Sequence, residues 1–280
     1  MLYEVNAHKE GAMKIKANGI SMNYEITGNG KWLTMVHGAG DNLGMWWNQV
    51  PIFSRSYHLL TYDVRGYGQT ETPPEGYSMD ILVEDLYQLL KTLGIDETYL
   101  LGYSMGGRVS LGFTLVHPGM VKALILANSP VVPIQRNAEQ MKEMMKLREE
   151  RMKAAAEQGR ATAMEDMTTM VFSPGWPEKH MDVIEQYRKT RLNNDPGASQ
   201  IAMRSMVMGA TPPDVSGIKC PTLIIGGEHD GLMGVESVRA GQALICGSQL
   251  KILPTGHASA IETPGEFNTT VLEFLAGMNK

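Results

Sequence analysis

The segment 102–106 reads Gly-Tyr-Ser-Met-Gly and joins an apolar run to a helix-like sequence. A strand that reverses into a helix within a couple of residues leaves no room for side chains beside the turn, and Gly102 and Gly106 supply that room. The residue between them is held in a strained turn, so that the hydroxyl of Ser104 projects outward. The N-terminus of the following helix favours developing negative charge. This segment is typical of a turn that presents a nucleophile.

A serine hydroxyl is a poor nucleophile unless a base takes its proton and a carboxylate orients that base. In proteins with such a turn, the acid and then the base follow at the carboxyl ends of later strands. Here the apolar run 222–225 is followed by Gly-Gly-Glu-His-Asp, and the run 250–253 by Pro-Thr-Gly-His. These positions predict Asp230 as the acid and His257 as the base.

Other residues compete for these two roles. Glu228 lies on the same loop as Asp230, and we favour Asp230 because Glu228 is nearer to the strand. The run 123–127 is followed by Asn128 and a serine, with no carboxylate. His229 is expected to shape the loop beside Asp230. The remaining histidines lie at the edges of elements or in polar surroundings: His8, His58, His117 and His180.

Acyl transfer also needs two N–H donors for the oxyanion that forms on the attacked carbonyl. The residue directly after the nucleophile supplies one, at the start of the helix, which predicts the N–H of Met105. The sequence His-Gly-Ala-Gly at 37–40 follows the apolar run 32–36 and predicts the N–H of Ala39 as the second donor. Gly38 is expected to let the substrate approach closely.

Short apolar runs and helix-like segments alternate around these residues. Alternating apolar and polar residues at 14–17 and 22–27 flank Asn18-Gly19 and predict an antiparallel hairpin. Continuous apolar runs, which suit strands buried on both faces, lie at 32–36, 59–62, 99–101, 123–127, 222–225 and 250–253. Helical periodicity is found at 79–93, 105–116, 235–244 and 264–275. This order predicts an α/β protein with a mostly parallel, eight-stranded sheet flanked by helices.

The segment 130–213 interrupts the alternation, because it has no buried-strand run and is rich in Met, Glu, Lys, Arg and Ala. Helices are predicted at 137–158, 161–171, 178–191 and 198–208. We therefore interpret 1–129 and 214–280 as one α/β core, with 130–213 as a helical cap inserted between the sixth and seventh strands. Eleven of the 21 methionines fall in this cap, where they either fill gaps between helices or line an adaptable apolar pocket.

The composition limits the classes of function. A net charge of -5 gives no electrostatic footprint for nucleic acid, and no apolar run is long enough to predict a membrane span. The first 16 residues lack the apolar centre of a signal peptide. Cys220 and Cys246 lie in apolar runs and are expected to be buried, free thiols. We expect a cytoplasmic protein that acts on a small molecule without a metal or an organic cofactor. The sequence leaves the oligomeric state open, and a homo-oligomer is one of the possibilities.

The sequence resembles enzymes of the α/β-hydrolase fold. Besides the motifs above, residues 63–68, Asp-Val-Arg-Gly-Tyr-Gly, resemble the family's D-x-R-G-x-G loop after the fourth strand, and 257–275 is similar to its terminal pattern. The stretch 37–46, followed by 53–55, is similar to 3-oxoadipate enol-lactonases and related small esterases. The resemblance implies a serine hydrolase that cleaves a carboxylic ester or lactone through an acyl-enzyme, with a cap in the position of 130–213.

Other members of this family leave alternatives open. Carbon–carbon bond hydrolases of aromatic degradation resemble the chain at 104–107, but usually carry Trp after the catalytic His, where this chain has Ala258. The menaquinone-pathway lyase is similar at 104–108, and there an Arg helps to bind substrate carboxylates. Arg108 either binds substrate in this way or pairs with a surface carboxylate. Haloalkane dehalogenases place Asp where Ser104 stands, and slow-turnover hormone receptors keep the same triad.

Overall fold

The computed structural model describes residues 13–131, 171–194 and 214–279, together with the isolated helical positions 142, 146, 150 and 153. Its strands are β1 (Met13–Ala17), β2 (Ile20–Gly28), β3 (Lys31–Val36), β4 (Tyr57–Tyr62), β5 (Thr98–Tyr103), β6 (Val121–Ala127), β7 (Thr222–Gly227) and β8 (Gln249–Leu253). The α-helices with described bounds are α1 (Val50–Phe53), α2 (Met79–Thr92), α3 (Met105–Val116), α6 (Met181–Leu192), α8 (Val235–Leu244), α9 (Ser259–Glu262) and α10 (Pro264–Ala276). Short 3₁₀ turns are η1 (Leu43–Trp46), η2 (Pro118–Met120), η3 (Pro177–Lys179), η4 (Val215–Gly217) and η5 (Gly277–Asn279).

The strands form one eight-stranded sheet in the order β1-β2-β4-β3-β5-β6-β7-β8. β1 and β2 run antiparallel to their neighbours, and the pairs from β3 and β4 onward are parallel. The hairpin turns at Asn18 and Gly19, whose φ angles of 46° and 78° match the twist of a two-residue hairpin. The predicted hairpin and mostly parallel sheet are both confirmed.

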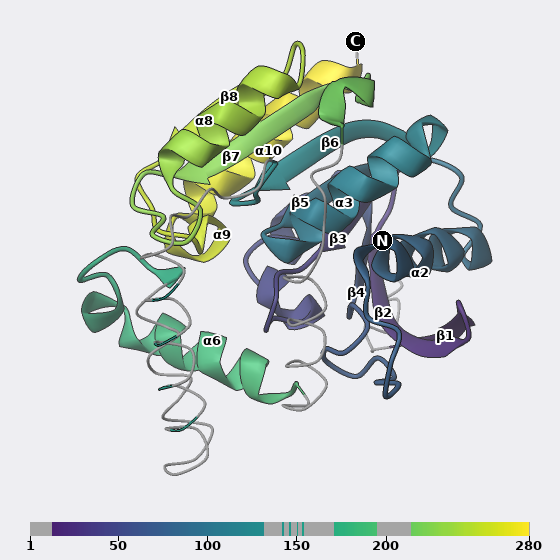
Figure 1. Ribbon diagram of the computed structural model, residues 1–280, viewed down its shortest axis with the longest axis horizontal. Helices are drawn as coiled ribbons and strands as arrows, with labels where there is room; N and C mark the ends of the chain where they lie inside the picture. The colour runs from purple at the N-terminus through teal and green to yellow at the C-terminus, as the bar shows by residue number, and fades with distance from the viewer. Residues whose placement is uncertain are drawn as a thin grey trace, which may run out of the picture.

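Helices cover both faces of this sheet (Figure 1). One core cluster joins the sheet to α2, α3 and α8, and a second joins the opposite face to α1 and α10. Consecutive residues of one strand enter different clusters, as Leu100 and Leu101 of β5 do. The apolar runs are continuous because the strands need apolar side chains toward both layers.

The four predicted helices of the core, α2, α3, α8 and α10, are present. β4 begins before its predicted run, since His58 lies inside the strand and stacks on Trp32 with 3.8 Å between ring centroids. The α1 and α9 helices escaped prediction because four residues are too few to show a helical stripe.

Within the predicted cap, the described segment 171–194 contains α6, which lies beyond the carboxyl ends of the strands (Figure 1). The predicted helix 178–191 begins later than expected, at Met181, because His180 has a non-helical φ of -136° and stacks on Trp176. Of the predicted helix 137–158, only positions 142, 146, 150 and 153 are described, and all four are helical. The remainder of that helix, the predicted helix 198–208, and 161–171 except for its last residue lie outside the described residues.

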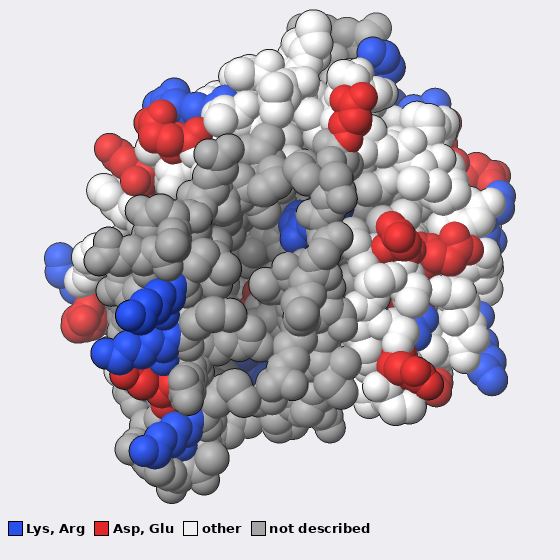
Figure 2. Space-filling model, viewed as in Figure 1, with Lys and Arg blue, Asp and Glu red and all other residues white. Residues whose placement is uncertain are grey.

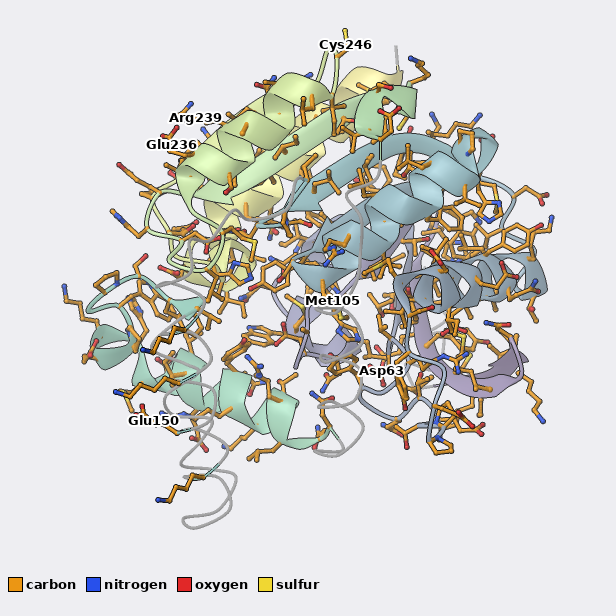
Figure 3. All side chains as sticks on the ribbon, in the orientation of Figure 1. Asp63, Met105, Glu150, Glu236, Arg239 and Cys246 are labelled. Carbon is orange, nitrogen blue, oxygen red and sulfur yellow. The ribbon has the colours of Figure 1, made fainter. Side chains whose placement is uncertain are left out.

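The cysteines correct one expectation. Both are free thiols, but Cys246 is exposed and Cys220 is half-buried. Cys246 follows the end of α8 in the turn toward β8 and points away from the molecule (Figure 3), so the apolar run around it did not predict its burial.

The described surface is of mixed charge on the face seen in Figure 2, where Lys and Arg are interspersed with Asp and Glu. In the described parts of the chain, no helix combines the length and the apolar character needed to cross a lipid bilayer.

The turn between β5 and α3 is tightly packed on β3. A Cβ on Gly106 would lie 2.1 Å from the carbonyl oxygen of Val36 and 2.5 Å from that of His37. A Cβ on Gly102 would lie 2.4 Å from the carbonyl oxygen of Gly106. Since Val36 and Gly102 are also paired in the sheet, the loop after β3 and the turn after β5 emerge side by side.

We predict that Gly106→Ala lowers the free energy of unfolding by about 3 kcal/mol, because backbone carbonyls cannot rotate away from an added methyl group. Chemical denaturation measures the difference. Gly119→Ala is the control, since Gly119 is exposed and a Cβ there would meet no atom within 4 Å. Equal stabilities of the two variants would contradict this packing of the turn.

Candidate active site

Ser104 is held in a strained conformation at the turn that precedes α3. Its φ of 52° and ψ of -114° lie outside the regions that ordinary residues favour. Its backbone N–H donates to the carbonyl of Ala127 at 2.9 Å, and its carbonyl accepts the Ser129 hydroxyl at 2.8 Å. The end of β6 and the loop after it thus hold the backbone, while the side chain stays partly exposed.

The structure brings Ser104, Asp230 and His257 together. Nε2 of His257 lies 2.9 Å from the Ser104 hydroxyl oxygen, and Nδ1 lies 2.8 Å from Oδ2 of Asp230. An ionised carboxylate can only accept a hydrogen bond, so Nδ1 carries a proton and the neutral ring leaves Nε2 free to accept from the serine O–H. The two buried side chains come from the loops that follow β7 and β8.

Asp230 is anchored by four hydrogen bonds. Oδ1 accepts the backbone N–H groups of Leu232 and Met233, each at 3.0 Å, and Oδ2 accepts Nδ1 of His257 and Nδ2 of Asn128. Burial raises the pKa of Asp230, but the hydrogen bond and charge of His257 and the other donors outweigh it and leave the pKa below its usual value. The carboxylate is therefore ionised at neutral pH.

Asn128, at the end of β6, is a positioning residue that sequence reasoning missed. Its Nδ2 lies 3.2 Å from Asp230 and 3.3 Å from the carbonyl oxygen of Gly256, and its Oδ1 accepts the hydroxyl of Ser259. The residue has a positive φ of 46° and is fully buried. The available signal in the sequence is a polar amide directly after a buried strand, a position where a carboxylate would have indicated an acid.

Glu262 is a second missed residue, and it joins the segment 171–194 to the His257 loop. Its carboxylate accepts the N–H of Gly256 at 2.7 Å, and the N–H and hydroxyl of Ser173 at 3.1 and 2.6 Å. The N–H of Ala258 donates to the carbonyl of Val171 at 2.8 Å. Burial raises the pKa of Glu262, with these hydrogen bonds opposing the rise. The competing acid Glu228 is exposed on the neighbouring loop.

His37 fixes the loop that carries Ala39. Its Nε2 accepts the N–H of Val64 at 2.9 Å, so Nδ1 is the protonated nitrogen and donates to the carbonyl of Gly38 at 2.8 Å. That carbonyl also accepts the N–H of Asp41, which closes a turn over 38–41. Gly40 has a φ of 79° at the third position of this turn, where glycine is favoured.

The two predicted oxyanion donors lie at the edge of these loops. The turn uses the N–H of Asp41 for its own hydrogen bond, which leaves the N–H of Ala39 outside it. Met105 is the first residue of α3 (Figure 3), where N–H groups have no acceptor within the helix. Both donors come from segments that flank Ser104.

The other predicted substrate contacts have clear positions. Gly38 faces the Tyr103 ring so closely that a Cβ would lie 2.8 Å from it. Arg108 is half-buried on α3, and burial lowers its pKa. The roles of both in substrate binding remain predictions.

The buried Arg191 of α6 adds a positive charge beside this loop. Its guanidinium lies 3.8 Å from the carboxylate of Asp41 and donates to the hydroxyl of Tyr187. Burial lowers the pKa of Arg191, but Tyr187 and Asp41 raise it by more, so the net shift is upward and the group stays charged.

Among the described residues, no cluster of His, Cys, Asp and Glu is suited to hold a metal ion.

The sequence profile of the alpha/beta hydrolase fold matches residues 31–264, which include every site residue described above. The chain belongs to the α/β-hydrolase fold family. The two relatives and the solved structure described next are each similar to this chain over most of its length.

The 3-oxoadipate enol-lactonase 2 of Acinetobacter baylyi is 27% identical over 262 residues, which are 92% of this chain and 94% of that relative. The 2-hydroxy-6-oxo-6-(2'-aminophenyl)hexa-2,4-dienoic acid hydrolase of Metapseudomonas resinovorans is 26% identical over 275 residues, 94% of this chain and 90% of the relative. The crystal structure of the enol-lactonase from Burkholderia xenovorans superposes with a TM-score of 0.84 at 26% identity and covers 94% of this chain and 100% of that chain.

In this α/β hydrolase, three of the described histidines outside the site pack on aromatic rings: His58, His117 and His180. His117 stacks on Tyr87 with 4.1 Å between ring centroids, and His58 stacks on Trp32. Neither lies free at an element edge as a solvated residue, although His117 does follow the last residue of α3, where a capping residue was expected.

We predict that His37 makes this α/β hydrolase less stable as the pH falls. Burial lowers its pKa despite the nearby Asp63 and Asp41, so the unfolded chain binds the proton more readily than the folded one. The stabilisation is therefore complete above about pH 6.5 and decreases below it, by up to about 1.4 kcal/mol per pH unit.

Urea unfolding from pH 7.5 to 5 measures this dependence. His37→Asn, whose side-chain N–H can replace Nδ1–H, should show a shallower slope. The exposed His229→Gln should keep the slope of the parent. Parallel curves for the parent and His37→Asn would contradict the prediction.

Proposed function

We propose that this protein is a serine hydrolase that cleaves a carboxylic ester or lactone through an acyl-enzyme. The observation that carries the proposal is the continuous hydrogen-bond chain from Ser104 through His257 to Asp230, with distances of 2.9 and 2.8 Å. This is the arrangement that makes an alcohol nucleophilic at neutral pH.

In the first step, Oγ of Ser104 attacks the carbonyl carbon of the substrate while Nε2 of His257 takes the hydroxyl proton. The negative charge moves to the carbonyl oxygen, which the N–H groups of Ala39 and Met105 stabilise. Asp230 stabilises the imidazolium by charge and by its hydrogen bond to Nδ1. His257 then gives the proton to the leaving alkoxide, and the carbonyl re-forms as the acyl-enzyme.

In the second step, water replaces the alcohol. His257 takes a proton from the water, and the hydroxide attacks the acyl carbon through a second oxyanion held by the same donors. Collapse of this intermediate releases the carboxylic acid and returns the proton to Ser104. For a lactone, the leaving alkoxide and the acid belong to one product molecule. This scheme needs no metal or organic cofactor.

The substrate is proposed from the relatives and from the segment 130–213. Two of the proteins similar to this chain are named enol-lactonases, which supports a lactone or small ester. We propose that 1–129 and 214–280 form the catalytic core and that 130–213 forms the cap over the site, with Gly38 and Arg108 in contact with substrate.

A carbon–carbon bond hydrolase is the second candidate, because one similar protein is named as a dienoic acid hydrolase. The residue after His257 is Ala258, which is buried against Val171 and Ile261. Where the resemblance to carbon–carbon bond hydrolases calls for Trp, this chain has a methyl group. Turnover of a series of p-nitrophenyl esters, lactones and a 2-hydroxy-6-oxo-dienoate distinguishes the two activities. Near-single turnover of every one of these substrates would instead indicate a receptor.

We predict that Ser104→Ala lowers kcat on a short p-nitrophenyl ester by more than about 10⁴-fold, because no other group in the scheme can form the acyl-enzyme. Circular dichroism should show an intact fold, and intact-mass spectrometry should detect the acyl adduct in the parent but not in the variant. Activity retained by the folded variant would remove Ser104 from the mechanism.

We predict that Asp230→Asn lowers kcat by about 10³- to 10⁴-fold, because an amide neither fixes the tautomer of His257 nor balances its charge. Glu228→Gln is the matched control from the same loop and should keep activity within about 2-fold, since Glu228 is exposed. Steady-state kinetics of both variants decide between the two acids. A greater loss in Glu228→Gln would reverse the assignment.

A further inference from the structure

Two neighbouring asparagines with different surroundings follow α6 directly. Asn193 is exposed, whereas Asn194 is 4% exposed and points into the contact between α6 and the core. A buried amide is costly unless its donors and acceptor find partners, so the partners of Asn194 indicate what the residue does.

Asn194 makes four hydrogen bonds, which use its side chain fully. Nδ2 donates to the carbonyl of Gly40 at 2.7 Å and to that of Asp41 at 3.2 Å. Oδ1 accepts the N–H of Gly68 at 2.7 Å and Nδ2 of Asn42 at 3.2 Å. One side chain of α6's end therefore holds the loop after β3 and the loop after β4.

The loop after β3 needs such an external restraint. Gly40 has no side chain and a φ of 79°, so the backbone beside Ala39 can adopt many conformations. The turn bond from Asp41 to Gly38 closes one side of the loop, and His37 holds the Gly38 carbonyl. Asn194 holds the remaining carbonyls, those of Gly40 and Asp41.

Other groups at the end of α6 enclose the same loop. Nδ2 of Asn42 donates to the carbonyl of Thr190 at 2.7 Å. The Arg191 guanidinium lies so close to Gly40 that a Cβ there would be 2.0 Å from it. The last turn of α6 thus packs directly against the loop after β3.

We propose that Asn194 is a positioning residue for the oxyanion hole. Through Gly40 and Asp41 it holds the turn in which the N–H of Ala39 faces the reacting carbonyl. The inference rests on the proposed function, because it assigns Ala39 as an oxyanion donor. A displaced donor stabilises the oxyanion of the transition state less well, whereas binding of the substrate in the ground state changes little.

The test compares Asn194→Ala and Asn194→Asp with Asn193→Ala as the matched control. The Asp variant keeps the acceptor for Gly68 and Asn42 but turns a carboxylate oxygen toward two carbonyl oxygens. Each protein is assayed with a p-nitrophenyl ester and with two inhibitors that differ only in one terminal group, a trifluoromethyl ketone and the corresponding methyl ketone. Only the trifluoromethyl ketone forms a stable adduct with a serine, whose oxyanion occupies the donors.

We expect kcat/KM to fall about 10- to 100-fold in both Asn194 variants, and the Ki of the trifluoromethyl ketone to rise in parallel. The Ki of the methyl ketone should change less than about 3-fold, and Asn193→Ala should resemble the parent. Equal weakening of both ketones would overturn the inference, since Asn194 would then shape binding in general. Parent-like kinetics of both Asn194 variants would also overturn it.

Thermal unfolding of each variant controls for loss of structure. If Asn194→Ala does not fold, the nearly isosteric Asn194→Asp carries the comparison, and failure of both to fold overturns a role confined to the oxyanion hole. The proposed function is judged separately: it fails if the parent neither hydrolyses the ester nor forms an adduct with the trifluoromethyl ketone.

Discussion

The hydrogen bond from Nδ1 of His257 to Asp230 is the interaction on which the remainder of the site depends. It places a carboxylate in the interior, where an unpaired charge would cost several kcal/mol. The structure offsets this cost with two backbone N–H groups and the amide of Asn128. The same bond orients the ring, so that Nε2 faces the hydroxyl of Ser104 at 2.9 Å. The need to balance the charge of Asp230 therefore accounts for the backbone donors in the loop after β7 and for the amide at the end of β6.

The parallel sheet provides the positions for these groups. Parallel strands begin and end at common edges, so the loops after β3, β5, β6, β7 and β8 come together although they are distant in sequence. Two polar side chains then fix the loops, Glu262 at the end of α9 and Asn194 directly after α6. Glu262 binds the segment 171–194 to the loop of His257, and Asn194 binds it to the loop of Ala39.

Periodicity and motif order sufficed to predict the sheet, the main helices of the core, and the three residues that meet in the site. A buried strand such as β5 has a continuous apolar run, and Ser104, Asp230 and His257 follow strands in a recognisable order. No role was predicted for Asn128, Glu262 or Asn194, because each is a single polar residue with at least one partner on a segment distant in sequence. Asn194 bonds to Gly40 across 154 positions, and no local pattern marks such a pair. The prediction for Cys246 was wrong for a different reason: its neighbours in sequence are apolar, but the residue itself lies exposed on a surface turn.

The attachment of 171–194 at both ends has a consequence for how this fold accommodates different molecules. Residues 171–173 join the loop of His257 and residues 190–194 join the loop of Ala39, with α6 between them. α6, a helix of twelve residues, covers about 18 Å of the path between these attachments, and residues 174–180 connect it to the first of them. Because both ends of the segment are fixed to the core, evolution or design can exchange side chains of α6 to admit another molecule without displacing either loop. A change in the length of α6 would instead have to be absorbed by residues 174–180, or it would shift the loops to which the segment is attached.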